Sequence, residues 1–493
     1  MGINLEVDSQ KTKTHKKHQM ALDLVEAGND NIDSYGKQER VSKRLPAGVS
    51  SKMLYQDVVR IAWPSFVELI LTQLASMVDM IMVGRLGAWA ITSVGLTTQP
   101  KFLMMTAFMA MNVGATALVA RYKGEGSIKK ANTVLRQALL LTFILSAIAS
   151  LVGFIFSEQF ILFMGAAETE TIAGGTIYFK IQMAGFIVLA LTSTLTAALR
   201  GVGDTRIAMV YNLIANIVNV IFNYLLIFGH FGFPRMEVAG ASLATIIGQC
   251  VAFIIALAVV IRGDRNLKLS FKDSFKPDWK IVKSIFNIGI PAMVEQIVMR
   301  IGIIIYAKTV ASLGTVAYAT HQVCLNIQGL SFMNGQAFAV SATSLVGQSL
   351  GKKRPDMAQA YSLRTRRIGM IISLIFACIL FLFSTQIIGL YTDDSRIIEK
   401  GAKILMFVAF TQPFQASQFI LAGALRGAGD TRAVAVVTFI TVLLVRPGLA
   451  IWTIKGLNWG LEGAWVALVA DQLLRSLLVL MRYNSGRWKT IKV

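Results

Sequence analysis

Long apolar segments separated by short polar ones follow one another from about residue 55 almost to the end of the chain. Many exceed 18 residues, the length at which a helix crosses the roughly 30 Å hydrocarbon core of a bilayer. They show no two-residue alternation, which favours helices over a barrel. The pattern predicts an all-α polytopic membrane protein with twelve transmembrane helices, near residues 59–83, 97–120, 133–156, 176–198, 207–229, 239–261, 285–311, 317–347, 362–384, 401–423, 432–453 and 461–481.

The chain is built from two related halves. The nonapeptide Ala-Leu-Arg-Gly-x-Gly-Asp-Thr-Arg occurs at 198–206 and again at 424–432, which are 226 positions apart. Glu68 matches Glu295 at a separation of 227. Each half holds six predicted spans, so both halves enter the membrane in the same orientation and form parallel repeats. We therefore expect two six-helix bundles with a central cleft between them.

Polar stretches flank and divide the two expected bundles. The first 50 residues lack the apolar core of a signal peptide, so we expect a disordered cytoplasmic tail. A long polar segment that contains a proline joins the halves and suits a flexible linker. The expected organisation is a tail (1–50), an N-terminal bundle (51–262), a cytoplasmic linker (263–284), a C-terminal bundle (285–482) and a basic cytoplasmic tail (483–493).

The net charge of +21 gives the orientation of the chain rather than a nucleic-acid partner. Lys and Arg residues gather in alternate loops, with seven at 262–283 and six at 352–367, whereas no loop on the other side holds more than two. Cytoplasmic loops carry such an excess of Lys and Arg. We therefore expect a multi-pass protein of the cell membrane with both termini in the cytoplasm and some attraction to anionic lipids.

Motifs for other kinds of function are missing from the sequence. It contains no Gly-x-x-x-x-Gly-Lys-Ser/Thr loop for ATP and no His-Glu-x-x-His zinc motif. We therefore expect a monomer with no enzyme activity, no cofactor and no metal centre. Without an ATP site, any transport would take its energy from an ion gradient or from the gradient of the transported molecule itself.

Four polar residues fall at a similar depth in three predicted spans of the N-terminal half. Asp79 lies in the first span, and Thr245 lies in the sixth. Asn219 and Asn223 share one face of the fifth span. An ionisable group inside a span is costly and marks a candidate functional site, and a carboxylate among amide and hydroxyl oxygens holds a proton or a small hard cation. The alternative is an interhelical hydrogen-bond cluster that only packs helices together.

Several motifs have the order and spacing of a known transporter family. They are the stretch from Pro64 through Met-Val-Asp-Met-Ile-Met-Val-Gly-Arg-Leu-Gly (77–87), Asn-Val-Gly-Ala-Thr-Ala-Leu-Val-Ala-Arg (112–121), both nonapeptides, residues 219–229, and His-Gln-Val-Cys-Leu-Asn-Ile-Gln-Gly-Leu-Ser-Phe-Met (321–333). Over about residues 55–485 the chain resembles the MATE (multidrug and toxic compound extrusion) transporters, in details closest to their DinF-like branch.

This resemblance implies a secondary transporter that works by cation-coupled antiport. The family's N-terminal coupling site has an Asp on the first helix, an Asn and an Asp four residues apart on the fifth, and a Thr on the sixth. Asp79, Asn219 and Thr245 match these positions, whereas Asn223 stands where an Asp is expected. The departure leaves Asp79 as the only titratable member, which favours a proton or a weakly bound ion.

Further charged residues are candidates for the substrate cleft. Glu68 and Glu295 each follow a helix proline by four residues, and their alternative role is to pair with a nearby Lys or Arg. Arg300 and Arg446 lie inside predicted spans of the C-terminal half, and such intramembrane cations could pair with Glu295 or Asp471 or meet an anionic or zwitterionic substrate.

The sequence as a whole predicts export of amphipathic small molecules by H⁺ or Na⁺ antiport with alternating access. The expected partners are these small molecules and membrane lipids. The alternative is a lipid or lipid-linked saccharide flippase of the same superfamily, which needs cations in the cleft to bind phosphate. Arg300, Lys308 and Arg446 would favour it if they face the cleft unpaired, and pairing with carboxylates would count against it.

Overall fold

The computed structural model describes residues 49–263, 267–270 and 272–491, and these residues are almost entirely helical. The predicted tail (1–50) falls almost wholly outside them. The first half contains α2 (Ser51–Gly84), α3 (Ala88–Gly124), α4 (Ile128–Ile155), α5 (Ser157–Phe163), α6 (Thr169–Ala184), α7 (Phe186–Gly201), α8 (Thr205–Phe228), η1 (His230–Gly232) and α9 (Glu237–Arg262).

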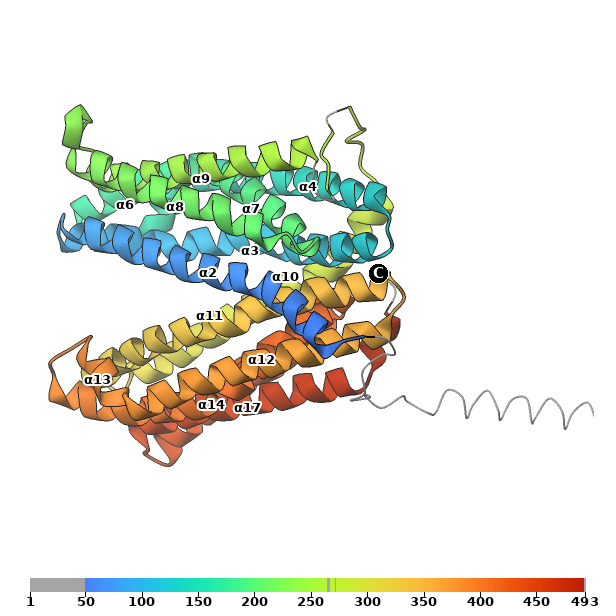
Figure 1. The fold of residues 1–493 in the computed structure, drawn as a ribbon. Coiled ribbons are helices and arrows are strands. Elements are labelled where there is room, and N and C mark those ends of the chain that lie inside the picture. Colours follow the sequence, from blue (N-terminus) through green and yellow to red (C-terminus); the bar gives the residue numbers. More distant parts are fainter. Residues whose placement is uncertain (1–48, 264–266, 271, 492–493) are drawn as a thin grey trace, which may run out of the picture. The chain divides into compact units, whose positions relative to one another are not determined.

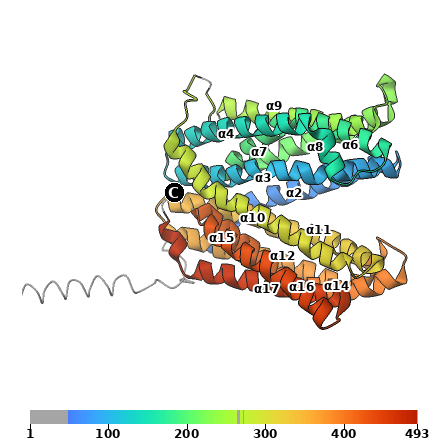
Figure 2. The same ribbon diagram turned by 180° about the vertical axis from the view of Figure 1, so that it is seen from behind.

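The second half repeats this order, with one interrupted helix near its end. It contains α10 (Trp279–Ala311), α11 (Thr315–Gly351), α12 (Pro355–Leu382), α13 (Ser384–Gly389), α14 (Ser395–Ala428), α15 (Thr431–Thr438), η2 (Phe439–Val445), α16 (Arg446–Ile451), η3 (Trp452–Gly456), α17 (Gly460–Asn484) and η4 (Arg487–Thr490). Two π-helical segments, η2 and η3, flank α16, where Pro447 lacks the N–H that a regular helix needs. Figure 1 shows α12, α14 and α17 of this half, and in Figure 2 α15 and α16 follow one another along the interrupted helix.

The predicted class of all-α polytopic membrane protein is confirmed. Within the described residues, ten helices are long and apolar enough to cross a membrane, and the pair α6 and α7, bent by 50°, makes an eleventh. The remaining predicted span, 317–347, corresponds to α11. This helix has 37 residues but is less apolar than the others. Several of its polar side chains bond to other helices, as when Asn334 donates to Ser373 Oγ at 2.9 Å.

The internal repeat of the sequence recurs in the contacts of the two halves. In the first half, Thr205 at the end of the repeated turn donates to the carbonyl of Ile61 on α2 at 2.9 Å. In the second half, Thr431 donates to Ile288 on α10, also at 2.9 Å. Both carbonyls lie three residues before a helix proline, at 64 and 291. The nonapeptide therefore ties the start of the fifth repeat helix to the first in each half.

The two halves meet closely near the end that carries the repeated turns, which we call the turn end. A Cβ atom at Gly124 of α3 would lie 2.0 Å from the carbonyl oxygen of Gln348 on α11. A Cβ atom at Gly351 of α11 would lie 2.0 Å from the carbonyl oxygen of Arg121 on α3. Gly124 and Gly351 occupy equivalent positions of the sequence repeat. Only glycine permits this approach of the two backbones.

The segment between the halves is attached to the N-terminal half. Asn132 and Gln137 of α4 bond to the backbone of Lys268 and Lys276, at 2.9 Å in each case. The helix α10 begins at Trp279, inside the predicted linker (263–284), because the Asp278 carboxylate caps it by accepting from the N–H of Lys280.

Candidate coupling site

The structure brings the four predicted coupling residues together at the far end from the repeated turns. Asn223 of α8 donates its amide N–H to Asp79 of α2 at 2.5 Å. The Asn219 amide, oriented to satisfy its neighbours, donates to both Asp79 oxygens at 2.9 and 3.3 Å. In that orientation its oxygen accepts from the backbone N–H of Thr245 on α9 at 3.2 Å. Two side chains of α8 therefore bond to one carboxylate of α2, and α9 bonds in turn to one of these side chains.

Close packing of α8 against α9 makes this convergence possible. Gly248 of α9 lies against the backbone of Ala215, where a Cβ atom would come within 2.7 Å of the carbonyl oxygen. The same added atom would lie 3.1 Å from the Cβ of Asn219. The small residue at this crossing lets the backbones of α8 and α9 approach each other. The Asn219 side chain is then directed towards α2.

The cluster presents hydrogen-bond donors to an acceptor rather than a cage of oxygens. Asn219 is 7% exposed and Asn223 is fully buried, while Asp79 is partly buried. The amide oxygen of Asn223 is buried without a hydrogen-bond partner. No group of three or more His, Cys, Asp or Glu side chains suited to a metal occurs in the described part of the chain. The arrangement of N–H donors suits an ionised carboxylate.

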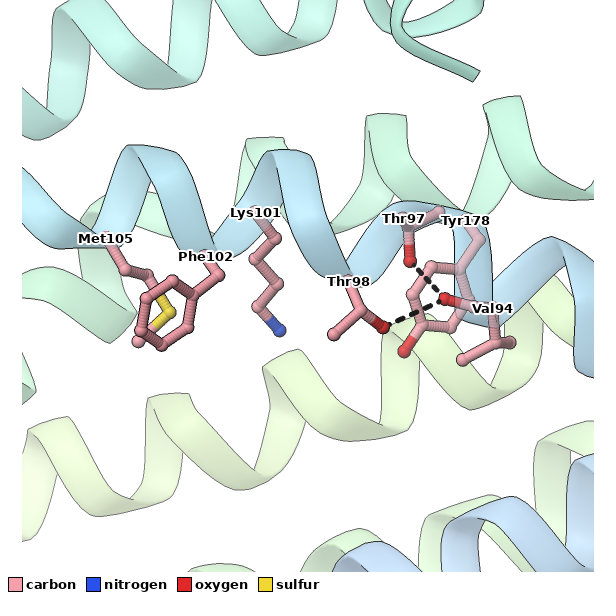
Figure 3. Close-up of a pocket in the computed structure, with 7 residues that line it drawn as sticks. All are labelled: Val94, Thr97, Thr98, Lys101, Phe102, Met105 and Tyr178. Atoms are coloured by element: carbon pink, nitrogen blue, oxygen red, sulfur yellow. Dashed lines mark hydrogen bonds between the residues drawn. The ribbon is translucent and has the colours of Figure 1, made fainter. Parts of the chain in front are cut away.

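A partly buried lysine of the neighbouring helix α3 was not predicted from the sequence. Lys101 of α3 donates its ammonium to the side-chain oxygen of Gln182 on α6 at 2.7 Å. It lines a cavity of about 200 Å³ together with Thr97, Thr98, Tyr178 and other residues, and Figure 3 shows its ammonium between Phe102 and Thr98. One feature of the sequence could have indicated Lys101 as a site residue. It lies inside the predicted span 97–120, and an ionisable group within a span needs a partner.

Glu68 and Glu295, predicted at the substrate cleft, each form an ion pair with an arginine of the repeated turn. Glu68 accepts from Arg200 at 2.9 Å, and Glu295 accepts from Arg426 at 2.5 Å. The two acids are 6% and 3% exposed. Asn212 adds a hydrogen bond of 2.6 Å to Glu68. The glutamate and arginine of each pair are 132 residues apart in the first half and 131 in the second. The recurrence of nearly the same separation in both halves could have indicated these pairs from the sequence.

Replacing Glu68 or Glu295 with glutamine is expected to lower the free energy of unfolding by about 1–3 kcal/mol in each case. Each change leaves an arginine without its charged partner in a largely buried setting. The two losses should be similar because the pairs are equivalent. Thermal unfolding of the purified protein measures them. The control is Glu399→Gln, which breaks the exposed pair with Lys403 and should cost at most about 0.5 kcal/mol.

The C-terminal half carries a different set of groups at the equivalent position. In the alignment of the two repeats, Tyr306 stands where Asp79 does, and Asp471 stands where Thr245 does. Asp471 is fully buried and accepts from both Arg446 and Arg475. The predicted cleft residue Arg446 is thus paired with Asp471 inside this half.

The remaining intramembrane cations have other surroundings. The guanidinium of Arg300 lies 3.5 Å from the ring centre of Phe102, a cation–π contact between the two halves. Lys308 and Lys180 are exposed.

Known proteins are similar to this chain in sequence. A family model described as MatE matches residues 64–225 and 291–452, one segment in each repeat. The chain is 31% identical over 443 residues to the probable multidrug resistance protein NorM of Thermotoga maritima, in a match that spans 88% of this chain and 93% of that protein. It is 28% identical over 455 residues to the multidrug resistance protein PmpM of Pseudomonas aeruginosa, in a match that spans 89% and 93%.

A solved structure agrees in fold. The outward-facing structure of a multidrug resistance transporter of the MATE family superposes with a TM-score of 0.82 at 21% identity and covers 91% of this chain and 100% of the other. The expected resemblance is thereby confirmed, since both repeats match the family model and a relative above 30% identity covers nearly the whole chain. This chain belongs to the MatE family of multidrug and toxic compound extrusion transporters.

Proposed function

We propose that this protein exports amphipathic small molecules across the cell membrane by cation-coupled antiport, with Asp79 as the coupling group. The observation that carries the proposal is the intramembrane carboxylate of α2 bonded by two asparagines of α8, one of which is held in turn by α9. Relatives named multidrug resistance proteins support the substrate class. The excess of Lys and Arg in alternate loops supports a cytoplasmic location for the turn end and for both termini.

Coupling arises because the charge of Asp79 changes which arrangement of the N-terminal half is stable. Ionised Asp79 accepts N–H groups from Asn219 and Asn223 and so holds α8 against α2. A proton or cation on the carboxylate weakens these hydrogen bonds and favours a second arrangement of the helices. The substrate binds one arrangement better than the other, so that substrate and cation compete through a shared equilibrium.

Efflux of an ethidium-type dye from cells tests this function. We expect efflux to stop when either the pH gradient or the Na⁺ gradient is collapsed by an ionophore, and to continue when the other is collapsed. The sensitive gradient identifies the coupling ion. Efflux that ignores both gradients would refute antiport.

The flippase alternative receives less support from the structure. Among the three cations that it needs, Arg446 is bound to Asp471. Arg300 is stacked on Phe102, and Lys308 is exposed. These positions do not gather positive charge at one place for a phosphate group.

A further inference from the structure

Two polar chains, one ending in a carboxylate and one in an ammonium, meet on the same turn of α9. Asp79 connects through Asn219 to Thr245. Lys101 connects through Gln182 to the carbonyl of Ser242, with bonds of 2.7 and 3.4 Å. Ser242 and Thr245 are three residues apart, so they lie on adjacent positions of one helix face. Hydrogen bonds therefore connect both charged side chains to the same turn of α9.

These hydrogen-bond chains bring the Lys101 ammonium and the Asp79 carboxylate to the same turn of α9, and opposite charges attract each other over such a range in a medium of low dielectric constant. Tyr178 of α6 lines the Lys101 cavity. The other charged group near the start of α9, Glu237, is exposed and pairs with Arg235 at 3.0 Å. In the part of the chain that the structure describes, Lys101 is thus the cation that faces the coupling carboxylate from a neighbouring helix.

Both charges are specific to the N-terminal half. The positions equivalent to Asp79 and Lys101 in the second repeat are Tyr306 and Gln328. The opposite charges are therefore present together in one repeat and absent together from the other. This joint occurrence is expected if each charge exists to balance the other in a medium of low dielectric constant.

The local chemistry discriminates between a proton and Na⁺. A hard metal cation needs several oxygen ligands, yet both asparagines direct N–H groups at Asp79. A metal ion would also stand close to the Lys101 ammonium, which repels it. A proton needs no ligand cage because it joins the carboxylate covalently.

We infer that Lys101 is a built-in counter-charge for Asp79 that takes the place of an exchangeable metal ion and makes the coupling site selective for H⁺ over Na⁺. Lys101 is a specificity-determining residue in this scheme. Protonation of Asp79 releases the ammonium from its counter-charge, and loss of the proton restores the pair. The inference rests on the proposed role of Asp79 as the coupling group.

Binding of ²²Na⁺ to the purified, reconstituted protein tests the inference directly. We expect the wild-type protein to show no saturable Na⁺ binding in the low millimolar range and no thermal stabilisation by NaCl relative to choline chloride. Lys101→Gln should bind Na⁺ at least about tenfold more tightly than the wild type, because the repelling charge is gone. The double variant Lys101→Gln with Asn223→Asp should bind more tightly still, since it adds a carboxylate ligand.

Two controls separate charge from packing. Lys101→Arg keeps the positive charge and should remain insensitive to Na⁺. Lys180→Gln removes an exposed lysine of α6 and should leave Na⁺ binding as in the wild type. Saturable Na⁺ binding by the wild-type protein, or equal Na⁺ affinity of the wild type and Lys101→Gln, would overturn the inference.

These outcomes are distinct from a failure of the proposed function. Transport that needs a Na⁺ gradient would overturn the inference and leave antiport standing. Transport that needs no gradient would refute antiport, and Na⁺ binding to the purified variants would still decide whether Lys101 excludes the metal ion.

Discussion

Replacing Asp79 with asparagine is expected to reduce gradient-driven efflux at least about tenfold, to near the level of membranes without the protein. Asparagine has nearly the same size as aspartate and keeps a hydrogen-bonding partner for the amides of α8. It cannot bind a proton or carry a negative charge, so the gradient no longer biases the two arrangements of the N-terminal half. Dye efflux from energised vesicles measures the loss.

Exchange of labelled for unlabelled substrate, with no gradient imposed, gives a second reading on Asp79→Asn. We expect exchange to persist, because it needs a folded transporter but no net movement of the coupling ion. The control is Glu237→Gln, which neutralises an exposed acid at the start of α9 and should transport like the wild type. Wild-type efflux by Asp79→Asn would show that the coupling group has been assigned incorrectly.

Replacing Asp471 with asparagine is expected to lower the free energy of unfolding by about 3–5 kcal/mol, the largest loss of stability among the variants considered. Asp471 is fully buried and is the shared acceptor for Arg446 and Arg475, which are 8% and 5% exposed. The substitution leaves two guanidinium groups without a counter-charge in the core of the C-terminal half. Thermal unfolding of the purified protein measures the effect.

A compensating variant shows whether charge imbalance causes the loss. Replacing Asp471, Arg446 and Arg475 together with leucine or methionine should recover most of the stability, because a buried ion cluster contributes little beyond an apolar one of equal volume. If Asp471→Asn unfolds at the wild-type temperature, the cluster does not contribute to stability in the way described here.

Much of the architecture follows from the sequence, because apolar length and internal repetition are properties of the chain itself. Spans predicted from hydropathy reappear as helices in both halves. The nonapeptide identified equivalent positions, and the structure shows why it recurs. Its threonine ties two helices together, and its arginine neutralises Glu68 or Glu295. From the sequence, pairing with a nearby Lys or Arg was the alternative role of Glu68 and Glu295, and the structure identifies the arginines of the nonapeptide as the partners.

The candidate site was predictable in part. Asp79, Asn219, Asn223 and Thr245 were expected at one depth, and depth along a helix can be counted from its ends. Whether they touch depends on helix rotation and crossing, which the sequence does not determine. Lys101 was missed for this reason, since its neighbour Gln182 lies far away in the sequence, on another helix. Hydropathy also does not show how the polar side chains of α11 are accommodated. In the structure neighbouring helices satisfy several of them, as Ser373 does for Asn334.

The glycine contact between α3 and α11 has a consequence for leakage. At Gly124 and Gly351 each backbone approaches the other so closely that a methyl group has no room. A file of water molecules cannot pass through such a contact, so it also offers no path along which protons hop. The contact that joins the halves therefore also blocks the path between α3 and α11 at the turn end to water and to protons. Protons cannot dissipate the gradient along this path without movement of substrate.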